Sequence, residues 1–111
     1  TLVELSQQAL GEGLSELAVD GGAANSSLLL QAQANSTGLK IRRPNNLEST
    51  AKGAALLAGL QAGVIENIKD LQSKRHEGSE LFTPVLPPSA RAVWRSKWDA
   101  AVLRSLKWHD E

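Results

Sequence analysis

The sequence predicts an α/β fold built on a parallel strand–helix–strand unit. Three segments carry this prediction: the short apolar run at residues 16–20, the helical pattern at residues 28–35, and the alternating run at residues 39–43. A helix of about ten residues between two strands predicts parallel neighbours joined by a right-handed crossover. Because two parallel strands alone form no stable sheet, we expect this unit to belong to a larger sheet.

The helices are predicted from apolar spacing and from the residues that end them. Residues 1–10 carry leucines at helical spacing and stop at Gly11. The polar residues 25–27 can all cap the second helix, which Gly38 ends. A polar turn, NNLES, precedes and caps a third helix at residues 50–62.

The last third of the chain has a different character. Residues 65–72 predict a short helix, residues 73–80 a polar surface loop, and residues 81–88 an extended segment because they include three prolines. Ser89 is expected to cap a final helix at residues 90–107. One face of that helix is a stripe at the spacing typical of a core: Trp94, Trp98, Ala101, Val102 and Ser105.

Composition excludes several classes of protein. Hydrophobic residues make up 41% and charged residues 22% of the 111 residues, which is typical of a globular domain. The formal net charge is zero, so a non-specific nucleic-acid binder is not expected. The chain has no cysteine, which excludes disulfides and thiolate metal sites.

The sequence also shows no segment that would place the protein in a membrane or direct it to secretion. The longest apolar stretch, residues 53–65, is interrupted by Gln61 and is too short to span a bilayer. No secretory signal is visible at the start of the chain. The chain begins at Thr1 and contains no methionine, so we expect a processed chain or, preferably, a piece of a longer one. We expect the protein to be cytoplasmic.

The pair Gly21–Gly22 is the most informative local feature. It follows a predicted buried strand, at the edge of an α/β sheet where ligands bind and where helix N-termini present free N–H groups. Bare backbone there would let a nucleotide lie against the chain, but the pattern alone favours a tight turn without a ligand. Neither a GxGxxG nor a GxxxxGK[ST] pattern occurs. Asp20 is expected to order the turn by hydrogen bonds, since no second carboxylate lies near it in sequence to make a metal or catalytic pair.

Other candidate sites have structural explanations. Basic residues interleave with tryptophans in the final helix, but we expect a docking helix with a solvated face rather than a nucleic-acid or membrane surface. His76 and His109 have no catalytic or metal-ligand spacing and are expected to be solvated. Small residues form one face of the third helix and predict close packing: Ala51, Ala55, Ala58 and Ala62. The basic and aromatic residues of the final helix are Arg91, Arg95, Lys97, Arg104 and Lys107 with Trp94, Trp98 and Trp108.

Four linked motifs resemble one known family. VDGG (19–22), LLLQAQ (28–33), RRP (42–44) and ESTAKGAALLAG (48–59) occur in the order and at the spacing of the FGGY family of carbohydrate kinases. The ending KWHDE, with Phe82, Pro84 and Trp98 before it, adds to the resemblance. Within that family the chain is similar to the members that phosphorylate glycerol, and the resemblance extends over nearly its whole length.

The resemblance implies an actin-like ATPase domain (ribonuclease H-like), with residues 1–111 as the carboxyl-terminal half of its second lobe and the catalytic first lobe absent. It implies ATP- and Mg²⁺-dependent phosphorylation of glycerol to glycerol 3-phosphate by a homo-oligomeric parent enzyme that binds neither nucleic acid nor membrane. The segment itself would hold no catalytic or metal-binding residue and would be inactive alone. Its implied part is to bind the adenine side of the nucleotide through Gly21, Gly22, Asn25 and Ser26.

Two departures from the family pattern leave alternatives open. Ser26 stands where the family has asparagine, although Asn25 is one step away, and Asn35 stands where aspartate is usual. These departures favour a degenerate module that binds nucleotide without catalysis. Another FGGY kinase, acting on a pentulose, is the second alternative, and the QxQ and RP motifs favour glycerol over it.

Overall fold

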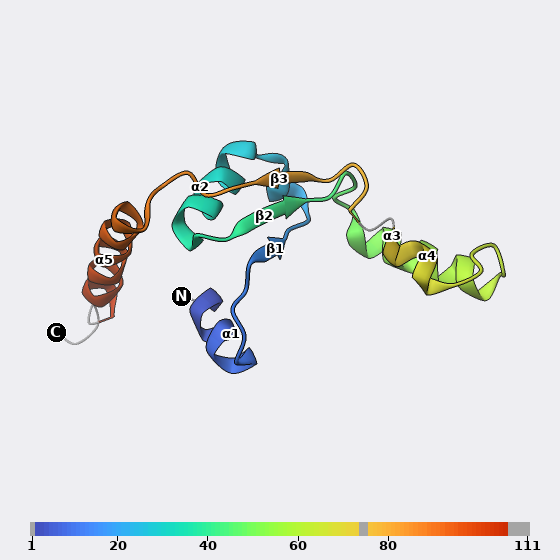
Figure 1. The fold of residues 1–111 in the computed structure, drawn as a ribbon, viewed down its shortest axis with the longest axis horizontal. Helices are drawn as coiled ribbons and strands as arrows, with labels where there is room; N and C mark the ends of the chain where they lie inside the picture. Colours follow the sequence, from blue (N-terminus) through green and yellow to red (C-terminus); the bar gives the residue numbers. More distant parts are fainter. Residues whose placement is uncertain (1, 74–75, 107–111) are drawn as a thin grey trace.

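A computed structural model describes residues 2–73 and 76–106 of the chain. A three-stranded sheet lies in the middle, with α1 and α5 at one end of the molecule and α3 and α4 at the other (Figure 1). The elements in order are α1 (Leu2–Leu10), β1 (Glu16–Ala18), the 3₁₀ turn η1 (Gly22–Asn25), α2 (Ser27–Thr37), β2 (Lys40–Arg43), α3 (Ser49–Gln61), α4 (Ile68–Ser73), β3 (Glu80–Phe82) and α5 (Pro88–Ser105).

The sheet contains the predicted parallel pair and one further strand. β1 pairs with β2 in parallel, with Leu17 beside Ile41, and α2 connects the two strands. β3 pairs antiparallel with the other side of β2, with Ile41 beside Phe82. The residues of β3 were expected to be extended or in a loop, not paired. β2 is therefore the central strand, whereas the sequence alone left it as a possible sheet edge.

α2 is held at both ends by the residues that the sequence suggested. Ser26 is its N-cap, and the Ser26 side chain accepts a hydrogen bond from the Leu29 N–H at 3.3 Å. Gly38 ends the helix with φ 75°, a left-handed conformation that favours glycine. α2 lies on one face of the sheet and packs Leu30 and Ala34 against Ile41 and Phe82, which together form the core.

The core is small because the chain is elongated. The radius of gyration is 18.5 Å, against about 13 Å for a compact domain of about 100 residues. α3 and α4 extend away from the sheet (Figure 1), and no residue of α3 is buried. The alanine face of α3 is exposed, contrary to the expected close packing. α3 also begins at Ser49 with Glu48 as N-cap, without a side-chain cap.

α5 differs from its sequence prediction in where it begins and in which face it buries. It begins at Pro88 rather than residue 90, and Pro87 rather than Ser89 is the N-cap. Proline suits the first helical position because its φ is already helical and its missing N–H has no partner there. Ala90, Arg91 and Arg95 form the half-buried face.

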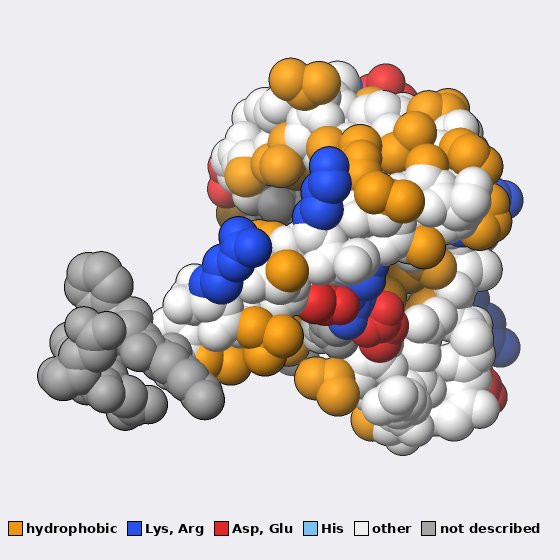
Figure 2. All heavy atoms as spheres, turned by 90° about the vertical axis from the view of Figure 1, so that its left-hand side faces the viewer, with side chains coloured by type: hydrophobic (Ala, Val, Ile, Leu, Met, Phe, Trp, Pro, Cys, Tyr) orange, Lys and Arg blue, Asp and Glu red, His pale blue; other side chains and the backbone are white. Residues whose placement is uncertain are grey.

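The tryptophan stripe of α5 consequently remains outside the core. Trp94 is 48% exposed and Trp98 is 62% exposed, so the expected core packing of this stripe is not found. Figure 2 shows hydrophobic side chains spread over the face of the molecule that α1 and α5 share. Lys107, Trp108 and His109 lie outside the described residues, and His76 is exposed, as expected. None of the helices in residues 2–73 and 76–106 is both long and apolar enough to cross a membrane.

Candidate functional site

The predicted site residues form one continuous turn at the carboxyl end of β1. Gly21 precedes η1, which contains Gly22 and Asn25, and Ser26 follows it and caps α2. The Gly21 N–H donates to the Leu47 carbonyl at 3.1 Å, and the Gly21 carbonyl accepts from the Ala24 N–H at 3.0 Å. The turn is therefore fixed at its start by the loop that leads from β2 to α3.

The two glycines of the turn meet different requirements. Gly21 has φ 82° and ψ 175°, a region that is essentially restricted to glycine. Gly22 has no such backbone conformation, and a Cβ placed on it would meet no heavy atom within 4 Å. Nothing in the described chain therefore requires glycine at position 22. The open space beside it allows a ligand to approach the backbone closely.

Asn25 and Ser26 have clear structural roles. The Asn25 carbonyl accepts a hydrogen bond from Arg43 Nη1 at 3.1 Å, and its side chain is exposed. Ser26 caps α2, as an asparagine at that position also would. The substitution of serine for the family's asparagine therefore preserves the cap.

A cavity of about 170 Å³ adjoins this turn. Asn25 is the one predicted site residue that lines it, and the other lining residues come from the end of β2, from the loop after it, from residue 78 and from β3. The lining residues are Asn25, Arg43, Pro44, Asn45, Leu47, Gly78 and Glu80.

Asp20 does not play its expected part. Its carboxylate accepts a hydrogen bond from the Ser49 hydroxyl at the start of α3, rather than binding the glycine turn. Gly21 instead reaches Leu47 through its backbone N–H. The two contacts attach the end of β1 to the start of α3 and to the loop just before it, so Asp20 helps to place α3 and does not bind the turn directly.

Arg43 is the residue that sequence reasoning missed. It was noted as part of the RRP motif, but no role was predicted for it. Its guanidinium donates to the carbonyls of Ala24 and Asn25 at 3.1 Å each, and to Ser27 Oγ at 3.1 Å. It also pairs with Glu80. Its position, as a cation at the carboxyl end of the strand next to the turn, was the sequence feature that could have indicated this role.

Asn35, the second departure from the family pattern, makes hydrogen bonds that an aspartate could also make. Its Oδ1 accepts from Gln31 Nε2 at 3.2 Å and from the Val85 N–H at 2.9 Å. Gln31 Nε2 also donates to the Thr83 carbonyl at 2.8 Å. An aspartate oxygen would accept the same two hydrogen bonds, so this departure leaves the link between α2 and the segment after β3 intact.

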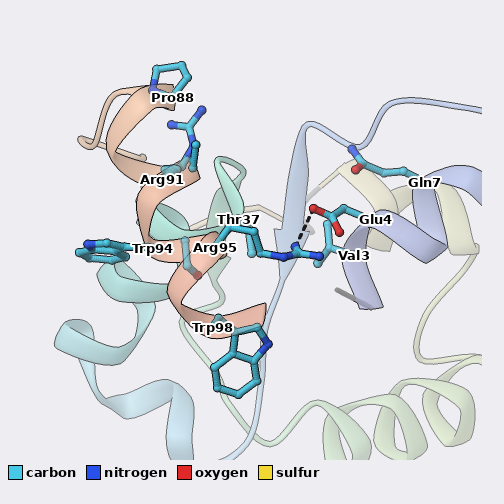
Figure 3. Close-up of a pocket in the computed structure, with 11 residues that line it drawn as sticks. Val3, Glu4, Gln7, Thr37, Pro88, Arg91, Trp94, Arg95 and Trp98 are labelled. Atoms are coloured by element: carbon cyan, nitrogen blue, oxygen red, sulfur yellow. Dashed lines mark hydrogen bonds and ion pairs between the residues drawn. The ribbon is translucent and has the colours of Figure 1, made fainter. Parts of the chain in front are cut away.

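A larger cavity, of about 630 Å³, lies between α1, the end of α2 and α5, and no residue of the turn lines it. Arg95 reaches across it to Glu4 at 2.7 Å, whereas Trp94 points away from α1 (Figure 3). Arg95 also pairs with Asp99, one turn further along α5. We place the candidate site at the glycine turn because the carboxyl ends of strands in α/β sheets are where ligands bind.

No metal site accompanies the turn. Within the described ranges, no three histidine, aspartate or glutamate side chains gather in a way that could hold a metal ion.

Residues 2–62 match the family model described as "FGGY family of carbohydrate kinases, C-terminal domain". The chain therefore belongs to the FGGY family of carbohydrate kinases. It is 37% identical over 107 residues to glycerol kinase of Saccharolobus islandicus, and 41% identical over 107 residues to glycerol kinase of Trichlorobacter lovleyi. Each alignment covers 96% of this chain and 21% of the relative, so the chain spans about a fifth of the relatives' length.

A solved structure gives the same relationship. The crystal structure of Plasmodium falciparum glycerol kinase with ADP matches with a TM-score of 0.81 and 26% sequence identity. The match covers 95% of this chain and 21% of that one. The predicted fold class, part of an actin-like ATPase (ribonuclease H-like) domain, is confirmed, and so is the resemblance to glycerol kinase.

Proposed function

We propose that the chain is the carboxyl-terminal half of the second lobe of an ATP-dependent glycerol kinase, called the parent enzyme below. The parent enzyme transfers the terminal phosphoryl group of ATP to a hydroxyl of glycerol and gives ADP and glycerol 3-phosphate. In this proposal the turn at Gly21–Ser26 binds the adenine side of the nucleotide. The FGGY match and the glycerol kinases among the relatives support the assignment.

The observation that carries the nucleotide assignment is the contrast between the two glycines. Gly21 is explained by its own φ of 82°, but Gly22 has an unrestricted backbone and open space in front of it. Neither its backbone conformation nor its neighbours in the described chain require glycine at position 22. A ligand that approaches the backbone closely would require it, and the carboxyl end of a strand in a parallel pair is where such a ligand binds. The ligand contacts that we assign are backbone contacts, so they survive the replacement of asparagine by Ser26.

The chemistry itself belongs to the rest of the parent enzyme. Phosphoryl transfer depends on positioning and on the stabilisation of charge by groups around the phosphates, including Mg²⁺. This chain contributes none of those groups in our proposal, so it is inactive when expressed alone. We further propose that the parent enzyme is a cytoplasmic homo-oligomer.

The test is a substrate comparison on the parent enzyme. With ATP and Mg²⁺, we expect turnover with glycerol and little with xylulose. Turnover with xylulose alone would replace glycerol kinase by a pentulose kinase of the same family. Nucleotide binding without turnover on either substrate would leave the non-catalytic module as the correct assignment.

A further inference from the structure

Arg43 joins three elements around the glycine turn. It is the last residue of β2, on the face of the sheet that α2 covers, and its side chain is 18% exposed. Nη1 donates to the carbonyls of Ala24 and Asn25, while Nη2 donates to Ser27 Oγ and pairs with Glu80 of β3. The guanidinium also lies 5.1 Å from the centre of the Phe82 ring, within range of a cation–π contact.

The two carbonyls bound by Arg43 have no hydrogen-bond partner within η1. They belong to the last two residues of η1, where the helical hydrogen-bond pattern stops and carbonyl groups need a partner from outside. The same short helix begins at Gly22. A guanidinium with five N–H donors in a fixed plane can bind both carbonyls and Ser27 at once, which a lysine ammonium cannot do with the same geometry.

We propose that Arg43 is a positioning residue for the nucleotide, acting through the backbone of Gly22–Asn25. It holds the carbonyls of Ala24 and Asn25 and thereby keeps the Gly22 backbone where the adenine side of the nucleotide lies. The inference rests on the proposed function, because it concerns the same site. It assigns no contact between Arg43 and the nucleotide.

Arg42 provides a matched control one residue away. Successive residues of a strand point to opposite faces of the sheet. Arg42 has a comparable exposure of 22% and binds Glu16 at 2.5 and 2.7 Å and Ser79 at 2.9 Å, but no atom of the turn. Removing either arginine breaks one carboxylate pair at the end of β2, and only the removal of Arg43 releases the turn.

The first measurement is hydrogen exchange at the amides of Ala24 and Ser26, which donate within the turn. In the parent enzyme, Arg43→Gln should raise exchange at both amides by about tenfold, because the loss of a hydrogen bond from a charged donor changes an equilibrium by at least roughly this factor. Arg42→Gln should leave both amides at the wild-type rate. Equal effects of the two variants would make Arg43 a general stabiliser of the sheet and overturn the proposal.

The second measurement separates an effect on nucleotide binding from an effect on glycerol binding. Arg43→Gln should raise the ADP Kd, measured by calorimetry, and the ATP KM by about tenfold while the glycerol KM stays unchanged. Arg43→Lys should fall between wild type and Arg43→Gln, and it carries the test alone where Arg43→Gln does not fold. An unchanged ADP Kd in both Arg43 variants would overturn the inference.

Gly22→Val distinguishes that failure from failure of the proposed site. When Gly22→Val weakens ADP binding and the Arg43 variants do not, the nucleotide site stands and the role of Arg43 is wrong. When Gly22→Val also leaves the ADP Kd unchanged, the nucleotide does not lie on this turn, and both proposals are overturned.

Discussion

Alanine in place of Gly21 measures how much the turn depends on an unusual backbone conformation. With φ 82° and ψ 175°, Gly21 occupies a region that costs another residue about 1–3 kcal/mol. A Cβ there would meet no atom within 4 Å, so the cost comes from the backbone and not from a steric clash with neighbours. We therefore expect Gly21→Ala to lower the free energy of unfolding by this amount.

Gly22→Ala is the matched comparison. Gly22 has an unrestricted φ and equally open surroundings. Alanine at a compatible position reduces the entropy of the unfolded chain, so Gly22→Ala should leave stability unchanged or raise it by up to about 1 kcal/mol.

Thermal unfolding followed by circular dichroism gives the assay. Each kcal/mol lost should lower the Tm by roughly 4–8 °C for a domain of about 100 residues. The two variants and the wild type are unfolded at one protein concentration, because exposed apolar faces make self-association, and hence the Tm, depend on concentration. Equal Tm values for Gly21→Ala and Gly22→Ala would refute the conformational explanation of Gly21.

Three further predictions concern other parts of the chain. Asn35→Asp should stay within about 0.5 kcal/mol of wild type, while Asn35→Leu should cost roughly 1–3 kcal/mol in urea unfolding because the partners of Oδ1 lose their acceptor. The Arg42 guanidinium hydrogen-bonds to Glu16 and lowers the pKa of that carboxyl below its ordinary value of 4.5. Because the folded-state pKa is the lower one, this stabilisation is complete above 4.5 and is lost as the pH falls through the folded-state value. Tm should therefore drop less steeply on acidification in Glu16→Gln than in wild type, and parallel curves would contradict this. Trp98→Ala should change the stability of the isolated chain by no more than about 0.5 kcal/mol, since the indole is 62% exposed, and a loss of several kcal/mol would mean that a contact buries it.

The parts of the fold that could be predicted are those with local signals. The β1–α2–β2 unit follows from short apolar runs separated by a capped helix, and both caps of α2, Ser26 and Gly38, are residues with a specific local function. β3 has three residues before a proline-rich segment, too few to show a period. Its identity as a strand depends on pairing with β2, which no local pattern expresses.

The half-buried face of α5 could not be predicted from the sequence for a different reason. Periodicity identified a stripe around Trp94 and Trp98 but could not say what would cover it. The structure instead turns Arg91 and Arg95 inward, because Arg91 donates to the Leu86 carbonyl at 2.7 Å and Arg95 pairs with Glu4. Long arginine side chains can bury their stems while their charged ends find partners, and hydrophobic spacing takes no account of this.

In the candidate site, contiguous residues were predictable and distant ones were not. Gly21, Gly22, Asn25 and Ser26 lie within one short segment, so a single turn brings them together. Arg43 lies about twenty residues further along and reaches the turn only because β1 and β2 are parallel neighbours with α2 above them. Its two partners in η1 are backbone carbonyls, which no residue type in the sequence identifies.

The central claim is that nucleotide lies against the backbone of Gly22. It is tested most directly by the ADP Kd of the parent enzyme with Gly22→Val, measured by calorimetry. Gly13→Val is the control, since Gly13 also has an unrestricted φ and open surroundings but lies before β1. We predict that Gly22→Val weakens ADP binding by at least about tenfold, or about 1.4 kcal/mol, and that Gly13→Val leaves it unchanged. A folded Gly22→Val enzyme that binds ADP as tightly as wild type would contradict the account.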